Sequence, residues 1–127
     1  MIAVDTSALM AIGLNEPEAD ACIAALEAAD SVLISAGTLA EVLIVATRRN
    51  IAEELSGLIE GLGFEVVPVT PASARRISQA YQQWGKGVHP AGLNFGDCFA
   101  YEVAKNHSCG LLYVGGDFAK TDIPSVL

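Results

Sequence analysis

The chain has 127 residues, of which 52% are hydrophobic and 17% are charged, and its formal net charge at pH 7 is −8. This composition excludes a disordered chain, and the length predicts a single domain over residues 1–127 with a sizeable hydrophobic core. The acidic balance argues against a general nucleic-acid coat, because such binding depends on lysine and arginine contacts to phosphates.

Strand and helix patterns alternate from the N-terminus. A buried strand over 2–4 leads into a short helix over 6–9, and apolar residues at helical spacing predict an amphipathic helix over 16–29. A strand over 31–35 follows. The next helix, over 38–49, is apolar on nearly all sides, so we expect it to lie at the centre of the molecule.

The second half continues the alternation. The expected elements are a helix over 51–62, a strand over 64–69 broken by Pro68, a helix over 71–84, a loop over 85–92, a helix over 95–107 and a strand over 110–114. Thr70 is the expected N-cap of the helix that begins at Pro71. Alternating strands and helices with short connections predict an α/β fold with a mostly parallel sheet and helices on both of its faces.

Four carboxylates end or interrupt these apolar segments. Asp5 follows the first strand, Glu41 lies inside the most apolar helix, Asp97 opens a helix, and Asp117 follows the last strand. Carboxylates are rarely buried unless they are paired or bind a metal, and ligand sites of open α/β sheets lie beyond the carboxyl ends of the strands. We therefore expect the four acids to converge on one site that a divalent cation holds together.

Three of these acids also fit ordinary local roles when taken singly. Asp97 stands where a helix N-terminus stabilises a carboxylate, Asp5 fits a cap of the turn that follows it, and Asp117 fits a turn after two glycines. Glu41 does not, because no lysine or arginine lies within one helical turn of it. A buried glutamate without a partner must protonate or find one elsewhere in the fold.

Clustered oxygen ligands suit Mg²⁺ or Mn²⁺ better than zinc, because no histidine or cysteine accompanies the acids at ligand spacing. We expect His89 and His107 to face solvent rather than to catalyse. A metal held by carboxylates can activate water and neutralise a phosphate. The chemistry that follows most naturally is metal-assisted hydrolysis of a phosphodiester bond.

Cysteine usage and hydropathy indicate a cytoplasmic protein without membrane contact. Cys22, Cys98 and Cys109 form an odd set without CxxC spacing, which fits reduced thiols. The longest strongly apolar stretch, residues 39–46, is too short to span a bilayer, and the N-terminus has no signal-peptide pattern.

Four segments together resemble a PIN-domain ribonuclease, and most of all the VapC-type toxins of toxin–antitoxin pairs. These segments are Ile2–Leu9, Thr38–Val42, Leu93–Tyr101 and Gly115–Ile123. Each motif is weak by itself, but four acids in this order, with these flanking residues and this chain length, form a specific pattern. The resemblance covers essentially the whole chain.

The resemblance implies a three-layer α/β/α sandwich around a mostly parallel sheet and a metal-dependent endoribonuclease. The acidic quartet that holds Mg²⁺ or Mn²⁺ and catalyses hydrolysis would be Asp5, Glu41, Asp97 and Asp117. The residues with a supporting role would be Thr6, Ser7, Asn94, Thr121 and Asp122. One departure is Gly116, where many members of the family carry asparagine, and it bears on the hydrogen bonding around Asp117.

The same resemblance implies three kinds of partner: a structured RNA of the translation machinery, a cognate antitoxin protein and a second copy of the chain. Two physical points agree. An anionic pocket attracts an arginine or lysine side chain of an inhibitor, which could displace the metal. The helices expected over 38–49 and 51–62 also carry more apolar surface than one small sheet needs, which favours an oligomeric or antitoxin interface.

Three other classes of protein share some of these features. A phosphoacceptor receiver domain needs an acidic pair after the first strand, and a haloacid-dehalogenase-type phosphatase needs Asp-x-Asp there. Position 7 is serine and Asp5 stands alone, so neither pattern is met. The third alternative is the PIN-like fold acting as a catalytically silent binding module.

Overall fold

Four parallel strands form the central sheet, in the order β3-β2-β1-β4. The strands are β1 (Ile2–Val4), β2 (Val32–Ser35), β3 (Glu65–Val67) and β4 (Gly110–Leu112). The computed structural model describes all 127 residues and confirms the parallel sheet expected from the sequence. β1 lies between β2 and β4, with Ile2 paired to both Val32 and Gly110. Asp5 therefore leaves the sheet from a central strand.

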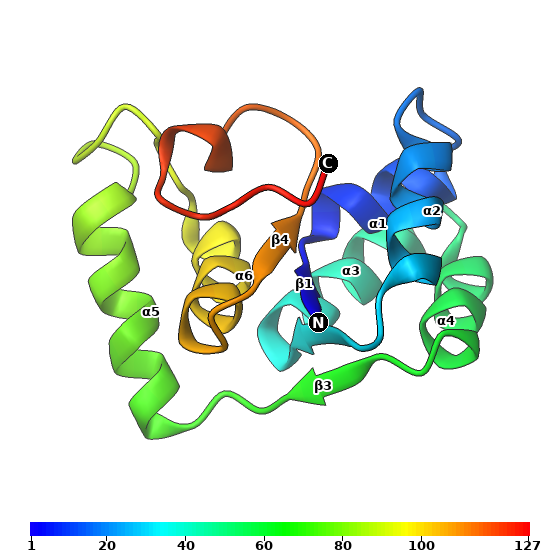
Figure 1. The fold of residues 1–127 in the computed structure, drawn as a ribbon, viewed down its shortest axis with the longest axis horizontal. Coiled ribbons are helices and arrows are strands. Elements are labelled where there is room, and N and C mark those ends of the chain that lie inside the picture. Colours follow the sequence, from blue (N-terminus) through cyan, green and yellow to red (C-terminus); the bar gives the residue numbers. More distant parts are fainter.

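Six α-helices and one short 3₁₀ helix surround the sheet (Figure 1). The helices are α1 (Thr6–Gly13), α2 (Ala19–Ala28), α3 (Ala36–Arg48), α4 (Ala52–Gly61), α5 (Pro71–Trp84), α6 (Phe95–Asn106) and the 3₁₀ helix η1 (Phe118–Lys120). No helix reaches the length and hydropathy that crossing a bilayer would need.

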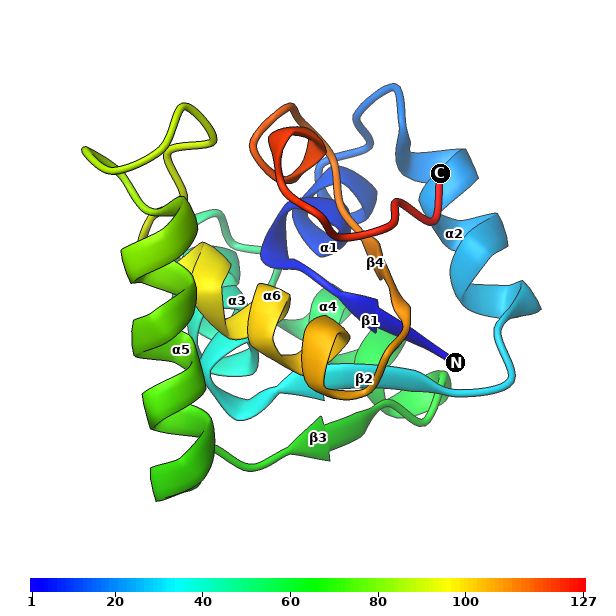
Figure 2. The same cartoon turned by 60° about the vertical axis from the view of Figure 1, so that its left-hand side comes forward.

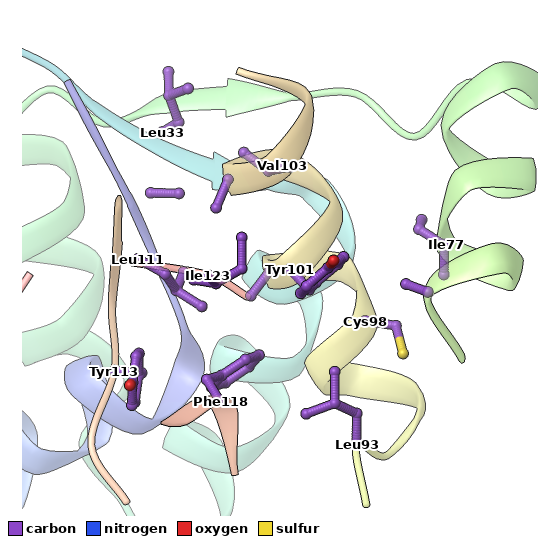
Figure 3. Packing of buried hydrophobic residues seen from close by; sticks show 14 residues of the cluster. Leu33, Ile77, Leu93, Cys98, Tyr101, Val103, Leu111, Tyr113, Phe118 and Ile123 are labelled. Carbon is purple, nitrogen blue, oxygen red and sulfur yellow. The ribbon is translucent and has the colours of Figure 1, made fainter. Parts of the chain in front are cut away.

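The strands bury alternate side chains on opposite faces, which produces two hydrophobic clusters. Ala3, Leu33 and Leu111 point to the cluster that α5, α6 and the C-terminal segment cover (Figure 3). Val4 and Leu112 point to the other cluster, which α1 to α4 cover. Figure 2 shows the sheet between these two groups of helices. The three-layer α/β/α sandwich is therefore confirmed.

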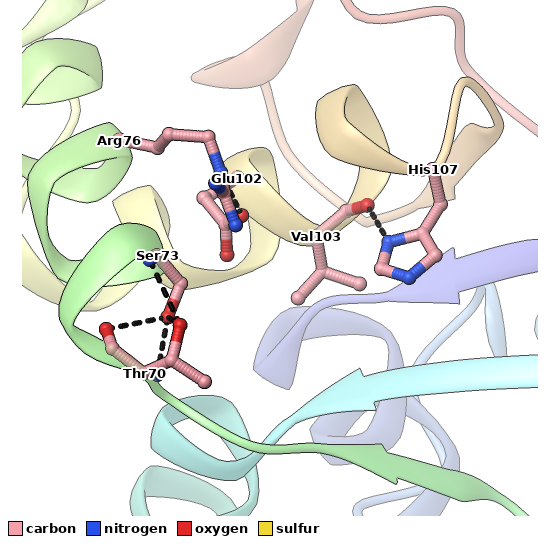
Figure 4. Close-up of polar contacts among 6 residues, drawn as sticks. All are labelled: Thr70, Ser73, Arg76, Glu102, Val103 and His107. Atoms are coloured by element: carbon pink, nitrogen blue, oxygen red, sulfur yellow. Dashed lines mark hydrogen bonds and ion pairs between the residues drawn. The ribbon is translucent and has the colours of Figure 1, made fainter.

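Most expected elements are present, with shifted ends. The helix expected over 6–9 continues to Gly13 because Met10 and Ala11 are buried as well. The helix expected over 71–84 matches α5 at both ends. Thr70 caps it in a reciprocal pair of hydrogen bonds with Ser73, drawn in Figure 4.

The helix over 38–49, which we expect to lie at the centre of the molecule because it is apolar on nearly all sides, buries only one of its faces. Only Thr38, Val42 and Ala46 of α3 are buried, whereas Leu43 is 40% exposed and Ile44 58% exposed. A helix at the edge of the core buries only the side chains on the face that packs against that core. Leu43 and Ile44 therefore form an exposed apolar patch on the outer face of α3.

Candidate functional site

Asp5 lies at the carboxyl end of β1 and is almost fully buried, with 4% of its surface exposed. It is the N-cap of α1, and its Oδ2 accepts hydrogen bonds from the Ser7 backbone N–H at 3.0 Å and the Ser7 hydroxyl at 2.7 Å. Its Oδ1 is buried and has no hydrogen-bond partner. The site therefore holds one unsatisfied oxygen that a cation would satisfy.

The environment of Asp5 favours its neutral form. Burial raises the pKa of Asp5 from 3.8 to about 6, against the lowering effect of the two Ser7 hydrogen bonds. The nearby carboxylates of Asp97 and Glu41 make a smaller contribution to the same rise. No ion pair in the structure involves any of these three acids, so no protein cation offsets their repulsion.

Glu41 is half-buried on α3 and finds its partner in a distant part of the sequence, as expected for a glutamate without a nearby cation. The Thr6 hydroxyl donates a hydrogen bond to its Oε1. Its Oε2 lies against the backbone of Gly96, where a Cβ atom would come within 2.5 Å of it. Glu41 thus joins the start of α1 to the start of α6.

Asp97 is half-buried in the first turn of α6, but the cap of that helix is Asn94. Asn94 Oδ1 accepts a hydrogen bond from the Asp97 backbone N–H at 2.8 Å, and Asp97 Oδ2 accepts one from the Asn94 backbone N–H at 3.0 Å. Burial raises the pKa of Asp97, and the charges of Asp117 and Glu41 raise it further. Asp97 therefore takes part in capping α6 and also lies close enough to Asp117 and Glu41 to be affected by their charges.

Asp117 is exposed and directly precedes η1. Gly115 before it has a φ of +103°, a backbone conformation that favours glycine. A Cβ atom at Gly116 would meet nothing within 4 Å, so this position has room for the Cβ atom of the asparagine that the resemblance implies there. Asp117 forms the solvent side of the acidic group, and its charge is felt at Asp97.

Three of the supporting residues contact the acids directly: Asn94 caps the helix together with Asp97, and the other two act through their hydroxyls. Ser7 donates its hydroxyl to Asp5 and accepts a hydrogen bond from the Val114 backbone N–H at 3.0 Å, which links Asp5 to the segment after β4. Thr6 holds Glu41. These two hydroxyls therefore orient the carboxylates of Asp5 and Glu41.

Thr121 and Asp122 lie in the C-terminal segment and bond elsewhere. Thr121 closes η1 by donating its hydroxyl to the Phe118 carbonyl at 2.7 Å. Asp122 accepts hydrogen bonds from the Tyr101 hydroxyl at 2.7 Å and from Lys105 Nζ at 2.6 Å, which occupy one carboxylate oxygen each. Asp122 is therefore engaged by α6.

The expectation that the two histidines face solvent is wrong, because both are half-buried and make structural contacts. His107 Nδ1 lies 2.9 Å from the Val103 carbonyl, as Figure 4 shows. His89 Nδ1 accepts a hydrogen bond from the Ala91 backbone N–H, and its ring packs edge-on against Trp84. Neither contacts the acids, so oxygen atoms alone make up the donor set.

This donor set fits a hard divalent cation such as Mg²⁺ or Mn²⁺. The unsatisfied Oδ1 of Asp5 is the observation that supports it. No three acidic, histidine or cysteine side chains already surround a single point closely enough to hold an ion. Mg²⁺ is usually bound through one or two carboxylates and keeps several waters, so the arrangement suits an ion that water partly coordinates.

Two apolar hollows flank the acids. One has a volume of about 410 Å³, lies between α3 and α6, and includes Glu41, Ile44 and Phe95 in its lining. The other, of about 610 Å³, lies between α5 and the start of α6. Phe95 lines both hollows and is 70% exposed. The acidic group is therefore bordered by an exposed apolar surface.

Comparison with known proteins identifies the family. Residues 2–124 match the PIN domain. The chain is 42% identical to ribonuclease VapC28 of Mycobacterium tuberculosis over 98% of this chain and 96% of that protein. It is 39% identical to ribonuclease VapC30 of the same organism over 97% and 96%. The chain belongs to the VapC-type ribonucleases of the PIN-domain family.

Solved structures confirm the PIN fold. VapC20 of Mycobacterium tuberculosis, a toxin that cleaves the sarcin-ricin loop, superposes with a TM-score of 0.78 at 18% identity, covering 97% of this chain and 96% of that one. A toxin–antitoxin complex from Klebsiella pneumoniae gives a TM-score of 0.73 at 22% identity, covering 96% and 93%. Membership of the PIN family overturns the receiver-domain and phosphatase alternatives.

Proposed function

We propose that this PIN domain is an endoribonuclease that hydrolyses RNA phosphodiester bonds with Mg²⁺ or Mn²⁺. The observation that carries the proposal is the buried, unpaired Oδ1 of Asp5 in a group of carboxylates that no protein cation neutralises. Metal-free, this arrangement is costly, because buried like charges repel. The similar proteins VapC28 and VapC30 are ribonucleases, which favours catalysis over a catalytically silent binding module.

Each acid has a distinct part in the proposed site. Asp5 is the fixed ligand, because Ser7 holds one of its oxygens and leaves the other free. Asp97 and Asp117 complete the ligand set from the solvent side, and Glu41, oriented by Thr6, binds the ion directly or through water. When bound, such an ion lowers the pKa of water and neutralises phosphate charge. The carboxylates would hold the ion and orient the water beside it.

Cleavage of total cellular RNA by the purified protein tests the proposal. We expect discrete fragments with Mg²⁺ or Mn²⁺ and none with EDTA. Asp5→Asn should lower the rate by roughly a thousandfold or more, the scale expected when metal activation of water is lost. Asp20→Asn, the same change at an exposed position of α2, should leave cleavage intact. Metal-independent cleavage, or full activity of folded Asp5→Asn, would refute the mechanism.

We further propose that the protein is a cytoplasmic toxin with three partners: a structured RNA, a cognate antitoxin and a second copy of itself. The similar Klebsiella structure is a toxin–antitoxin complex, and the VapC20 toxin cleaves a structured RNA loop. An acidic group without a cation of its own is complementary to an arginine or lysine of an antitoxin. The exposed apolar side chains beside it, among them Ile44 and Phe95, supply contact area for protein partners.

A further inference from the structure

The segment that carries Asp117 is attached to the rest of the protein at both of its ends. At its start, the Val114 backbone N–H donates to the Ser7 hydroxyl, which also holds Asp5. At its end, Asp122 accepts hydrogen bonds from Tyr101 and Lys105 of α6. Between these attachments lie two glycines, which leave the backbone free to turn. Hence the direction of Asp117 depends on how its segment is held.

Four residues from three parts of the fold form the second attachment, which we name the Tyr101 clamp: Trp84, Tyr101, Lys105 and Asp122. Trp84 Nε1 donates to the Tyr101 hydroxyl at 2.9 Å, and that hydroxyl donates to Asp122 Oδ1 at 2.7 Å. Lys105 Nζ donates to Asp122 Oδ2 at 2.6 Å. The clamp thereby joins α5, α6 and the C-terminal segment.

Tyr101 is the buried centre of this clamp, with 5% of its surface exposed. Burial, together with the hydrogen bond to Asp122, raises the pKa of Tyr101 to about 12, so the phenol keeps its proton. Partial burial by itself raises the pKa of Asp122, but the hydrogen bonds from Lys105 and Tyr101 outweigh it and lower that pKa. Both shifts agree with the observed hydrogen bond, in which the phenol donates to the carboxylate.

Apolar contacts alone do not set the direction of the segment. Phe118 and Ile123 anchor it in the hydrophobic cluster that also contains Tyr101 (Figure 3). Hydrophobic contact is non-directional, whereas a hydrogen bond constrains both distance and angle. Lys105 and Asp122 are each about half-exposed, so their ion pair adds little by itself. The buried phenol is the part of the clamp that can define an orientation.

We propose that Tyr101 and Asp122 are positioning residues that aim Asp117 at the reacting centre by fixing the end of its segment. This inference rests on the proposed nuclease function of Asp117. It also assigns to Asp122 a task other than metal binding, because both of its oxygens are already engaged by α6.

Tyr101→Phe is the sharpest test, because it keeps the ring in the core and removes only the hydroxyl. A misplacement of about 1 Å can lower a rate about a hundredfold, so we expect kcat to fall roughly ten- to a hundredfold. KM for RNA should change little, and the Mn²⁺ concentration needed for half-maximal rate should rise. Asp122→Asn should shift the same quantities in the same direction.

Arg76→Gln is the matched control. Arg76 Nε donates to the buried Glu102 at 2.9 Å, so this change also breaks a polar contact between α5 and α6 (Figure 4). It leaves residues 113–122 untouched. We expect Arg76→Gln to lower thermal stability at least as much as Tyr101→Phe while keeping kcat and the Mn²⁺ requirement of the wild type.

Hydrogen exchange of the metal-free proteins provides a readout that needs no activity. Amides of residues 115–121 should exchange faster in Tyr101→Phe than in the wild type and Arg76→Gln proteins. Equal exchange in all three proteins would overturn the proposal. An active wild type with unchanged kcat and Mn²⁺ requirement in Tyr101→Phe would also overturn it, whereas an inactive wild type with faster exchange in the variant would refute the nuclease function alone.

Discussion

At the scale of single residues, Asp5 couples stability to pH. Its pKa is about 6 in the folded protein against an ordinary 3.8, mainly because of burial. Between pH 3.8 and about pH 6 the folded state therefore binds more protons than the unfolded state. The metal-free protein loses stability as the pH rises through this range. The difference corresponds to roughly 3 kcal/mol at neutral pH.

We therefore expect Asp5→Asn to be more stable than the wild type at pH 7.5 in EDTA, by up to roughly 3 kcal/mol, and about equal to it at pH 4. Urea denaturation at the two pH values measures the difference. Saturating Mg²⁺ should stabilise the wild type and not the variant. Stability differences that are equal at both pH values would show that Asp5 does not titrate in this range.

At the scale of elements, Gly96 lets α3 and α6 approach each other at the site. A Cβ atom there would come within 2.5 Å of Glu41 Oε2, which is the end of a flexible side chain. Gly96→Ala should therefore displace the Glu41 carboxylate from Thr6 while costing little stability, because alanine favours a helix by about 1 kcal/mol over glycine.

The expected result for Gly96→Ala is a kcat reduced roughly tenfold or more at nearly unchanged melting temperature. Gly57→Ala, in α4, is the control, because a Cβ atom at Gly57 meets nothing within 4 Å. Steady-state cleavage assays measure kcat of both variants, and thermal melts measure their melting temperatures. Wild-type kcat in Gly96→Ala would mean that the position of Glu41 does not limit the reaction.

Some of these elements and contacts could be predicted from the sequence, and others could not. The bounds of α5 follow from local signals, since Thr70 and Pro71 start a helix and Gly85 ends it. The location of Asp5 follows from the rule that sites lie beyond strand ends. The contact of Glu41 with Thr6 and that of Asp122 with Tyr101 span 35 and 21 residues, and no local pattern encodes them. The close approach at Gly96 is equally a product of tertiary packing.

At the scale of the whole molecule, the exposed apolar surface beside the acids predicts self-association. Leu43, Ile44 and Phe95 are between 40% and 70% exposed, and a hollow of about 410 Å³ lies between α3 and α6. The exposed Leu43 and Ile44 of α3 meet no core of this chain, so their apolar character is explained if a second copy covers them. We expect a dimer at micromolar concentration by light scattering.

Ile44→Asp tests this interface, because an unpaired charge buried between two copies costs about 3 kcal/mol or more, which weakens Kd roughly a hundredfold. The variant should be monomeric at concentrations where the wild type is dimeric. Val88→Asp makes a similar change at a loop residue that is 60% exposed and remote in sequence from α3, and it should stay dimeric. A monomeric wild type would leave the apolar face of α3 to an antitoxin, whereas a dimeric Ile44→Asp protein would place the contact between copies on another face.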